Sequence, residues 1–509
     1  MTSFNVTGFS AIARSLIAGE VGFVGRNGAL VISGINAVIM NGASDLIVEG
    51  SVVSDADGVF MDDGGSVTVS AAGTILSTTG KGIDIGGNDG AKTISNAGLI
   101  QGQRDGIGWS VLNAGIPDYQ LTVFNSGTII GVDRAGIYSI VRDAQQTLIN
   151  NSGTIGGYEY GVLTLNVNPS GIQRIVNSGE ISGGTTGVRG SSEADVILNS
   201  GLIQSASAVS GGIALDLLGG DDVVLNTGTV LGDISMGDGN DSFDGRGGTA
   251  SGIVFGGAGN DTFIVDDAIL GLSEDASGGT DIVQSTVGWT LGDNFENLDL
   301  IGAADIFGIG NGLDNTITGN GGDNRLEGNG GFDILNGGAG NDVLLGGSDD
   351  DTMDGGDGDD HLRGETGKDT VSGGTGNDVL RGNQGNDKLF GNSGDDVING
   401  GAGSDRMWGG DDSDTFQFTK ASHSPNSTAA DAIKDFVVGE DQIDLSALVP
   451  GPIVFIGAGV FSGTGAAEVR ATISAADTIV RVDVDGDGTA DMRIDLSNAV
   501  GLTELDFIL

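Results

Sequence analysis

The chain has 509 residues, including 97 glycines and no cysteine, and its 70 acidic residues against 21 basic ones give a formal net charge of −49. This balance argues against nucleic acid as a partner, because phosphate contacts need clustered Lys and Arg. The lack of cysteine excludes disulfides and thiolate metal sites. The sequence has no apolar run of about 18 residues that could span a bilayer, and its N-terminus lacks the basic start and apolar stretch of a cleaved secretory signal.

A five-residue phrase, Asn-Ser-Gly-Thr-Ile or a close variant, recurs in the first half of the chain at steps of 22–29 residues. Between its copies lies a second phrase, a glycine followed by an aliphatic residue, as in Gly106-Ile107. Two short strands per period with Gly and Asn corners predict a right-handed parallel β-helix over residues 1–232. An antiparallel β-sandwich is the competing fold. The recurrent Asn side chains are expected to form an amide ladder at one corner, each bonding the next: Asn96, Asn125, Asn151, Asn177, Asn199 and Asn226.

Aromatic and charged residues gather on part of this predicted β-helix. Aligning the turns on the Gly-aliphatic phrase places Arg104, Arg134 and Glu159 at one position of successive turns, and all four tyrosines, Tyr119 included, lie within 42 residues. Rings beside arginines and acids could bind a sugar chain, whereas the alternative is an ordinary solvated face. The candidate ligand face consists of Arg104, Trp109, Arg134, Tyr138, Tyr158 and Tyr160.

Residues 233–309 contain two isolated nine-residue units followed by mixed sequence. The units begin at Met236 and Gly256, and each contains Gly-x-Gly-Asn-Asp. The Asp that ends this motif in each unit, Asp241 or Asp261, stands at the acidic position of the longer repeat that follows. Both are therefore candidate metal ligands.

From Gly310 to Gln417 the chain repeats every nine residues, twelve times, in the pattern G-G-x-G-x-D-x-U-x, where U is a large apolar residue. Glycines at positions one, two and four are expected to take positive φ and turn their carbonyls inward. The Asp at position six offers a hard anionic oxygen, which calcium prefers, and position eight points into the core. One loop and strand make half a turn, so like positions stack every 18 residues. A disordered acidic tract is the alternative, but it has no reason to keep an apolar residue at position eight of every unit.

The position-six residues are expected to form two columns of calcium ligands. Asn315 and Asn324 replace Asp in the first two units, and Asp349 and Asp412 replace the position-four glycine in two others, so sites there should be weaker or absent. The block carries 22 acidic and 6 basic residues, a net charge of −16, so calcium binding and folding are expected to be one event. One column contains Asp333, Asp351, Asp369, Asp387 and Asp405, and the other contains Asp342, Asp360, Asp378, Asp396 and Asp414.

Residues 418–509 leave the nine-residue register. The segment from Asp483 has the D-x-D-x-D-G start of an EF-hand loop, but Ile494 stands where a bidentate Glu is expected, and no helical pattern flanks the segment. A strand-flanked acidic turn from Asp483 to Asp491, with or without calcium, is the favoured interpretation. The chain ends with Asp506-Phe-Ile-Leu509, an acidic residue followed by large apolar ones.

These motifs resemble those of known families. The nine-residue pattern resembles the calcium-binding repeat of RTX proteins. The order of motifs after Gln417 resembles the C-terminal domain of serralysin-type secreted proteases, which caps the roll and is exported by type I secretion. The resemblance covers roughly residues 236–509 and implies an uncleaved C-terminal export signal. The protease itself is missing, because His361 and His423 are the only histidines and neither can build the zinc motif H-E-x-x-H.

Two further activities lack their motifs. No G-x-S-x-G nucleophile elbow of an RTX lipase is present. Secreted alginate epimerases also combine a β-helix with calcium repeats, but Val162-Leu163 follows Tyr160-Gly161 in place of their Tyr-Gly-x-Asp-Pro-His motif.

The sequence therefore predicts an all-β protein. Its parts are a β-helix (1–232), a calcium-repeat pair and spacer (233–309), a calcium-binding parallel β-roll (310–417) and a small β cap with the export signal (418–509). The expected partners are calcium, the type I secretion machinery and a polysaccharide or cell-surface glycan. The expected function is a secreted, extracellular or cell-surface interaction role such as adhesion, with no catalytic residue identified. The alternative is a carbohydrate-active enzyme on the β-helix, a polysaccharide lyase, hydrolase or epimerase.

Overall fold

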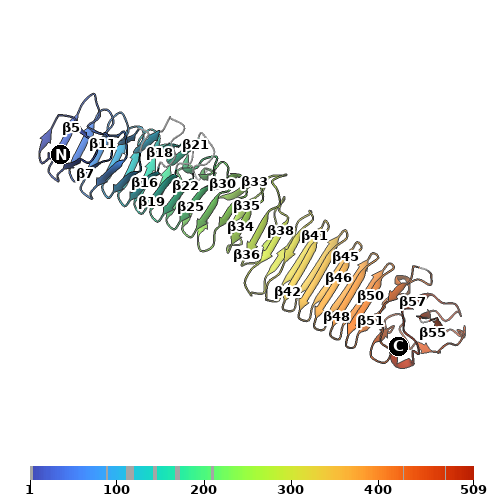
Figure 1. The fold of residues 1–509 in the computed structure, drawn as a ribbon. Coiled ribbons are helices and arrows are strands. Elements are labelled where there is room, and N and C mark those ends of the chain that lie inside the picture. Colours follow the sequence, from blue (N-terminus) through green and yellow to red (C-terminus); the bar gives the residue numbers. More distant parts are fainter. Residues whose placement is uncertain are drawn as a thin grey trace. The chain divides into compact units, whose positions relative to one another are not determined.

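The computed structural model describes residues 4–86, 90–110, 120–141, 146–166, 172–207, 211–427, 429–475 and 477–509. They form two compact units, Met1–Asp281 and Ile282–Leu509, each built from stacked β-strands (Figure 1). The described residues contain no α-helix, only short 3₁₀ turns such as η2 (Ala421–His423) and η3 (Glu504–Asp506). The prediction of an all-β parallel solenoid is confirmed, and the antiparallel sandwich is excluded by the parallel pairing described next.

The N-terminal unit is a parallel β-helix with three strands per coil, so every third strand shares a sheet. One sheet runs through eleven strands from β2 (Phe9–Ser10) to β32 (Thr249–Ala250), and another through twelve from β3 (Arg14–Leu16) to β35 (Gly271–Ser273). The remaining face follows parallel pairings from β1 (Asn5–Val6) to β34 (Thr262–Val265). The two recurrent phrases predict only two of the three strands, because the strand that precedes the Asn corner has no fixed phrase.

The core of this unit is a set of stacked aliphatic columns. Alternate strand residues point inward, and the inward aliphatic of the Asn-Ser-Gly-Thr-Ile phrase is fully buried in seven successive coils. The register pairs each of them with its equivalent in the next coil. The column consists of Ile75, Ile100, Ile129, Ile155, Ile181, Ile203 and Val230.

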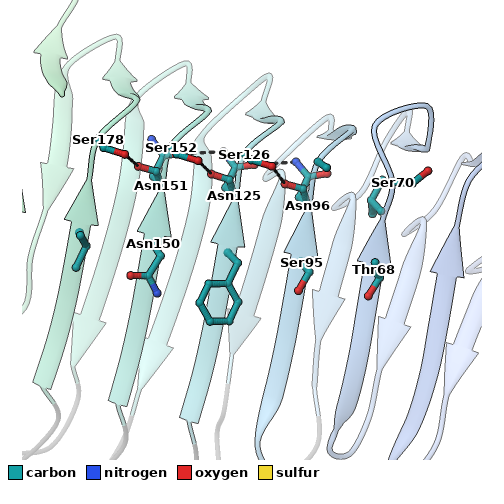
Figure 2. Close-up of a pocket in the computed structure, with 14 residues that line it drawn as sticks. Thr68, Ser70, Ser95, Asn96, Asn125, Ser126, Asn150, Asn151, Ser152 and Ser178 are labelled. Carbon is teal, nitrogen blue, oxygen red and sulfur yellow. Dashed lines mark hydrogen bonds between the residues drawn. The ribbon is translucent and has the colours of Figure 1, made fainter. Parts of the chain in front are cut away.

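The predicted amide ladder is present at one corner of the β-helix. Each of the five Asn side chains from Asn96 to Asn199 donates an Nδ2 hydrogen bond of 2.8 Å to Oδ1 of the Asn in the next coil, ending at Asn226. Figure 2 shows Asn96, Asn125 and Asn151 at equivalent positions of successive coils. These Asn residues end the strands β13 (Lys92–Asn96), β16 (Gln120–Asn125), β19 (Gln146–Asn151), β22 (Ile172–Asn177), β25 (Asp195–Asn199) and β28 (Val223–Asn226).

The C-terminal unit is a two-sheet roll whose strands alternate between its sheets. It begins with β36 (Ile282–Ser285) and β37 (Trp289–Thr290), continues through β38 (Asn297–Leu300) and β39 (Phe307–Ile309), and passes directly into the nine-residue repeats. From β36 to β53, even-numbered strands form one sheet and odd-numbered strands the other. The repeat strands are β40 (Thr316–Thr318), β41 (Arg325–Gly330), β42 (Ile334–Ala339), β43 (Val343–Ser348), β44 (Thr352–Asp357), β45 (His361–Thr366), β46 (Thr370–Thr375), β47 (Val379–Gln384), β48 (Lys388–Ser393), β49 (Val397–Ala402), β50 (Arg406–Asp411) and β51 (Thr415–Gln417).

The position-eight side chains fill the space between these two sheets. All twelve are at most 1% exposed, as predicted. Like positions pair with an 18-residue offset, as in Leu326 with Leu344 and Leu344 with Leu362. The buried column residues are Ile317, Leu326, Leu335, Leu344, Met353, Leu362, Val371, Leu380, Leu389, Ile398, Met407 and Phe416.

The last segment extends both sheets and then turns antiparallel. In one sheet β50 pairs with β52, which pairs with β57, and in the other β51 pairs with β53, which pairs with the C-terminal strand β58. A hairpin series β55–β56–β57 is antiparallel. The strands are β52 (Asp431–Ile433), β53 (Gln442–Asp444), β54 (Val454–Phe455), β55 (Glu468–Ser474), β56 (Asp477–Asp483), β57 (Met492–Leu496) and β58 (Phe507–Ile508).

Candidate calcium centre

The position-six carboxylates stack in the two predicted columns. In each, Oδ1 of one Asp accepts a hydrogen bond from the backbone N–H of the position-six residue 18 positions earlier, at 2.6–3.0 Å. One column runs from Asn315 through Asp333 to Asp405, and the other from Asn324 through Asp342 to Asp414. The columns therefore orient every carboxylate in the same way.

The second oxygen of each carboxylate is buried and has no hydrogen-bond partner. This holds for Oδ2 of all ten position-six Asp residues from Asp333 to Asp414, although a buried polar atom normally finds one. Oδ2 of Asp342 lies in the space that a Cβ on Gly337 would occupy, and the carbonyl oxygen of Gly355 in the next turn faces the same space at 2.5 Å from that position. A carboxylate oxygen and a backbone carbonyl converge in the same way beside most of these glycines, as at Gly328 and Gly373.

The glycines at position one are required for space rather than for backbone conformation. Positions two and four take positive φ, as at Gly338 (103°) and Gly340 (112°), but position-one glycines such as Gly337 do not. The prediction of positive φ at position one is wrong. A side chain there would collide with the Asp carboxylate, so position one must remain without a Cβ.

The unpartnered oxygens fit a hard cation. Carboxylate and carbonyl oxygens are the ligands that calcium takes in proteins, and an unpartnered buried carboxylate oxygen needs a counter-charge. Burial raises the pKa of Asp342 to about 6, of Asp360 to about 7 and of Asp414 to about 8, with repulsion from neighbouring carboxylates adding to the shift. The ten position-six Asp residues would hold the ion, which would supply the missing positive charge.

The side chains of the two Asn residues that begin the columns have hydrogen-bond partners within the protein. Nδ2 of Asn315 donates to the carbonyl of Phe295 at 3.0 Å, and Nδ2 of Asn324 donates to the carbonyl of Ile306 at 3.3 Å. Oδ1 of each Asn lies beside the position-one glycine, where the following Asp residues present Oδ2, but it already accepts a hydrogen bond of 2.7 Å from a backbone N–H of its own loop. This geometry supports the expectation that no strong calcium site forms there.

The substitutions at position four preserve the shape of the loop. Asp349 and Asp412 take φ values of 83° and 76°, the left-handed conformation of the glycines that they replace. The carboxylates of Asp351 and Asp414 in the same loops still carry an unpartnered Oδ2. The loops thus remain able to present ligands, at the cost of a strained backbone.

A third column lies in the N-terminal unit and contains Asp241 and Asp261. The backbone N–H of Asp222 donates to Oδ1 of Asp241 at 2.7 Å, and that of Asp241 donates to Oδ1 of Asp261 at 2.8 Å. Oδ2 of all three is buried without a partner. The backbone N–H of Asp261 in turn donates to Oδ1 of Asp281, so the column continues to the end of the unit.

Sequence reasoning missed four Asp residues that extend the columns. Asp222 and Asp281 each follow Gly-Gly after one residue, without the x-Gly of the repeat, so the pattern does not match. Asp431 accepts from Asp405, 26 residues earlier, and Asp441 accepts from Asp414, 27 residues earlier, because inserted loops break the nine-residue spacing. All four share one sequence feature that could have identified them, an aliphatic residue two positions after the Asp.

Position five carries a second, exposed set of hydrogen bonds between turns. Oδ1 of Asn341 accepts from the backbone N–H of Asp359, and Oδ1 of Asp359 accepts from that of Asn377, each at 2.8 Å. The recurrence of Asn and Asp at this position could have predicted these hydrogen bonds. These side chains brace the loops without contributing buried charge.

The acidic turn near the C-terminus is flanked by strands, as predicted. It joins the antiparallel strands β56 and β57. Carboxylate oxygens of Asp483, Asp485 and Asp491 lie within 4.8 Å of one another, but both oxygens of Asp483 already accept hydrogen bonds from the backbone N–H groups of Gly486 and Gly488. Calcium at this turn remains a proposal.

The candidate ligand face of the β-helix is largely internal. β15 (Ile107–Ser110), β18 (Ala135–Val141) and β21 (Tyr160–Asn166) pair in the predicted register. Trp109 is fully buried, because it lies two residues after the inward Ile107 and shares its side of the strand. Tyr138 is only 7% exposed.

The remaining members of this face divide between interior and surface. Arg134 forms a two-pronged ion pair with the buried Asp105, at 2.8 and 2.5 Å, and covers the Tyr138 ring at 3.5 Å. Tyr160 packs partly buried beside Tyr138. Arg104 and Tyr158 are exposed. Tyr119 lies outside the described residues.

A shallow groove lies instead beside the Asn ladder. It has a volume of about 370 Å³ and is lined by equivalent residues of five coils, including Thr68, Ser95, Phe124 and Asn150 (Figure 2). The Phe124 side chain is 47% exposed at this groove. The groove crosses successive coils, as an extended ligand would.

The fold and the carboxylate columns together define a calcium-binding parallel β-solenoid. The family model of the RTX calcium-binding nonapeptide repeat matches in four copies, over residues 253–267, 309–344, 345–380 and 381–416. The chain therefore carries RTX repeats, which bind calcium.

Solved structures that resemble part of the chain include two modules of the mannuronan C5-epimerase of Azotobacter vinelandii. The AlgE6R3 subunit is 25% identical over 32% of this chain and 80% of its own, with a TM-score of 0.23. The AlgE6R2 subunit is 26% identical over 30% of this chain and 88% of its own, with a TM-score of 0.21. No curated protein matches the chain. Among the described residues, no helix has the length and apolar character needed to cross a membrane.

Proposed function

We propose that the protein is secreted, folds on meeting extracellular calcium and serves an extracellular or cell-surface interaction role such as adhesion. The observation that carries this proposal is the pair of columns in which ten buried carboxylates each leave one oxygen without a partner. A roll that needs calcium at the affinity of extracellular modules, roughly 10⁻⁴–10⁻³ M, stays unfolded where calcium is scarce. An unfolded chain is suited to passage through a secretion channel.

The C-terminal segment supports export by its resemblance to the secretion domain of serralysin-type proteases. In the folded protein its last strand, β58, pairs with β53, and Phe507 is 6% exposed. Asp506 is buried and accepts a hydrogen bond from the backbone N–H of Gly439 at 2.7 Å. An export signal in this segment would therefore have to be read before the cap folds.

Export is tested by deletion of residues 450–509 in a Gram-negative host with a type I exporter. The truncated chain should stay in the cell. The control is the full-length chain with Asp360→Ala and Asp378→Ala, which impairs the roll but keeps the C-terminus, and it should still reach the medium. Normal export of the truncation would contradict a C-terminal signal.

Glycan binding on the β-helix is the second candidate, favoured by the groove that contains exposed Phe124. An aromatic ring can stack on a sugar face, and the neighbouring hydroxyl and amide groups can bond to sugar hydroxyls. Phe124→Ala should abolish binding on a glycan array, whereas Phe9→Ala, which removes another exposed ring, should not. Release of new reducing ends or unsaturated uronates from acidic polysaccharides would instead identify the enzyme alternative.

A further inference from the structure

Three buried carboxylates from three separate segments meet at the end of the N-terminal unit. Asp261 follows β33 (Ile253–Ala258), Glu274 follows β35, and Asp281 is the last residue of the unit. Ligand oxygens of the three lie within 4.8 Å of one another, and the residues are 1%, 7% and 0% exposed. Only Asp261 belongs to a nine-residue repeat.

The register explains how Glu274 enters this site. Phe255 pairs with Ser273 in parallel strands. The residues that follow them, Gly256 and Glu274, therefore lie side by side. Gly256 is a position-one glycine, and the residue stacked on it in the following coil would be another glycine in a regular repeat. Here a glutamate occupies that place.

The carboxylate of Glu274 replaces the carbonyl ligand of a regular site. A Cβ on Gly256 would collide with both Oε1 of Glu274 and Oδ2 of Asp261, whereas the equivalent space at Gly337 holds one carboxylate oxygen and the carbonyl of Gly355. Oδ2 of Asp261 has no hydrogen-bond partner and points into this space. Oε2 of Glu274 is held by the backbone N–H of Gly257 at 3.0 Å, which fixes the orientation of Oε1.

We propose that Asp261, Glu274 and Asp281 form a discrete calcium site of higher affinity than those of the roll. It deepens the calcium-dependent function proposed above and rests on it. More carboxylates at one calcium site raise its affinity, and each regular roll site draws its carboxylates from repeat Asp residues alone. Three buried carboxylates this close together repel one another, so the cluster needs a cation.

The test is a calcium titration of the chelator-stripped, full-length protein by calorimetry. One site should saturate at about tenfold lower calcium than the roll sites. Glu274→Gln, which keeps the shape and an acceptor for Gly257, should remove this site, whereas Asp275→Asn, which removes an exposed charge one residue away, should leave it. An isotherm of Glu274→Gln that matches those of wild type and Asp275→Asn would overturn the proposal.

A second measurement separates a metal ligand from a structural glutamate. Glu274→Gln should raise the thermal stability of the N-terminal unit in chelator, because it relieves repulsion, and lower it in calcium, because it removes a ligand. The same sign in both conditions would overturn the site. Absence of any calcium response in the wild-type roll would contradict the calcium-dependent function itself, which is a different failure.

Discussion

Oδ1 of Asp360 accepts a hydrogen bond of 2.7 Å from the backbone N–H of Asp342, one turn earlier, while Oδ2 of the same carboxylate is buried with no partner. One oxygen thus orders the loop and the other is left for an ion. In both columns of the roll, Oδ1 accepts the hydrogen bond between turns and Oδ2 has no partner. This arrangement allows the two roles to be separated by substitution.

Asp360→Asn should keep the loop hydrogen bond and lose the ion. The amide of Asn retains one oxygen, which can accept from the backbone N–H of Asp342 as Oδ1 of Asp360 does. At a calcium concentration tenfold above Kd, each lost site removes about 1.4 kcal/mol of stabilisation. Chemical denaturation in calcium measures this loss.

The matched control for that variant is Asp359→Asn, at the adjacent exposed position. Asn341 and Asn377 already occupy the same column, and their Oδ1 atoms make the same contact. This control should leave calcium-dependent stability unchanged. Equal losses in the two variants would contradict a specific role for position six.

Acid should partly replace calcium in folding the roll. Burial raises the folded-state pKa of Asp351 to about 7, of Asp369 to about 6 and of Asp396 to about 7, against about 3.9 in an unfolded chain. The metal-free fold is therefore most stable below about pH 4 and loses that stability as pH rises through 6–7. In chelator, circular dichroism should show more β-structure at pH 4.5 than at pH 7.5, and the reverse order would refute this.

Asp349→Gly should stabilise the calcium-loaded roll by about 0.5–1 kcal/mol. The φ of Asp349 is 83°, and glycine takes this conformation without the steric cost of a Cβ. Asp354→Gly removes the same charge from an exposed position in strand β44 and should destabilise by a similar amount. Thermal denaturation in saturating calcium compares the two, and a gain in both variants would indicate a charge effect instead.

Asn151→Ala should destabilise the β-helix by about 3 kcal/mol, because it leaves buried groups without partners. The Asn151 side chain accepts from Asn125 and donates to Asn177 and to the carbonyl of Glu180. Asn150→Ala changes the neighbouring residue, which faces the groove, and serves as the control. Equal melting temperatures for the two variants would show that the ladder is not structural.

The sequence was sufficient wherever one residue type recurred in register. Both the Asn ladder and the position-eight core follow from such recurrence, because a solenoid stacks like on like. It was insufficient where spacing changed. Asp431 joins its column across a longer loop, and Glu274 joins the Asp261 site from outside the motif.

Side-chain direction was the other source of error. Trp109 shares the inward side of its strand with Ile107, and period-two alternation alone could have placed it in the core. Tyr138 should point outward by the same rule after Ile137, but Arg134 covers its ring while pairing with buried Asp105. That contact depends on three residues in two coils. It does not recur among the residues that the structure describes, so no repeat in the sequence predicts it.

Hydrogen exchange of the full-length protein, resolved over residues 310–417 and measured at pH 7.5, tests the central claim most directly. The backbone amides of the roll should be unprotected in chelator and gain protection together at about 0.1–1 mM calcium. Equal protection of these amides in chelator and in calcium would contradict the coupling of calcium binding to folding.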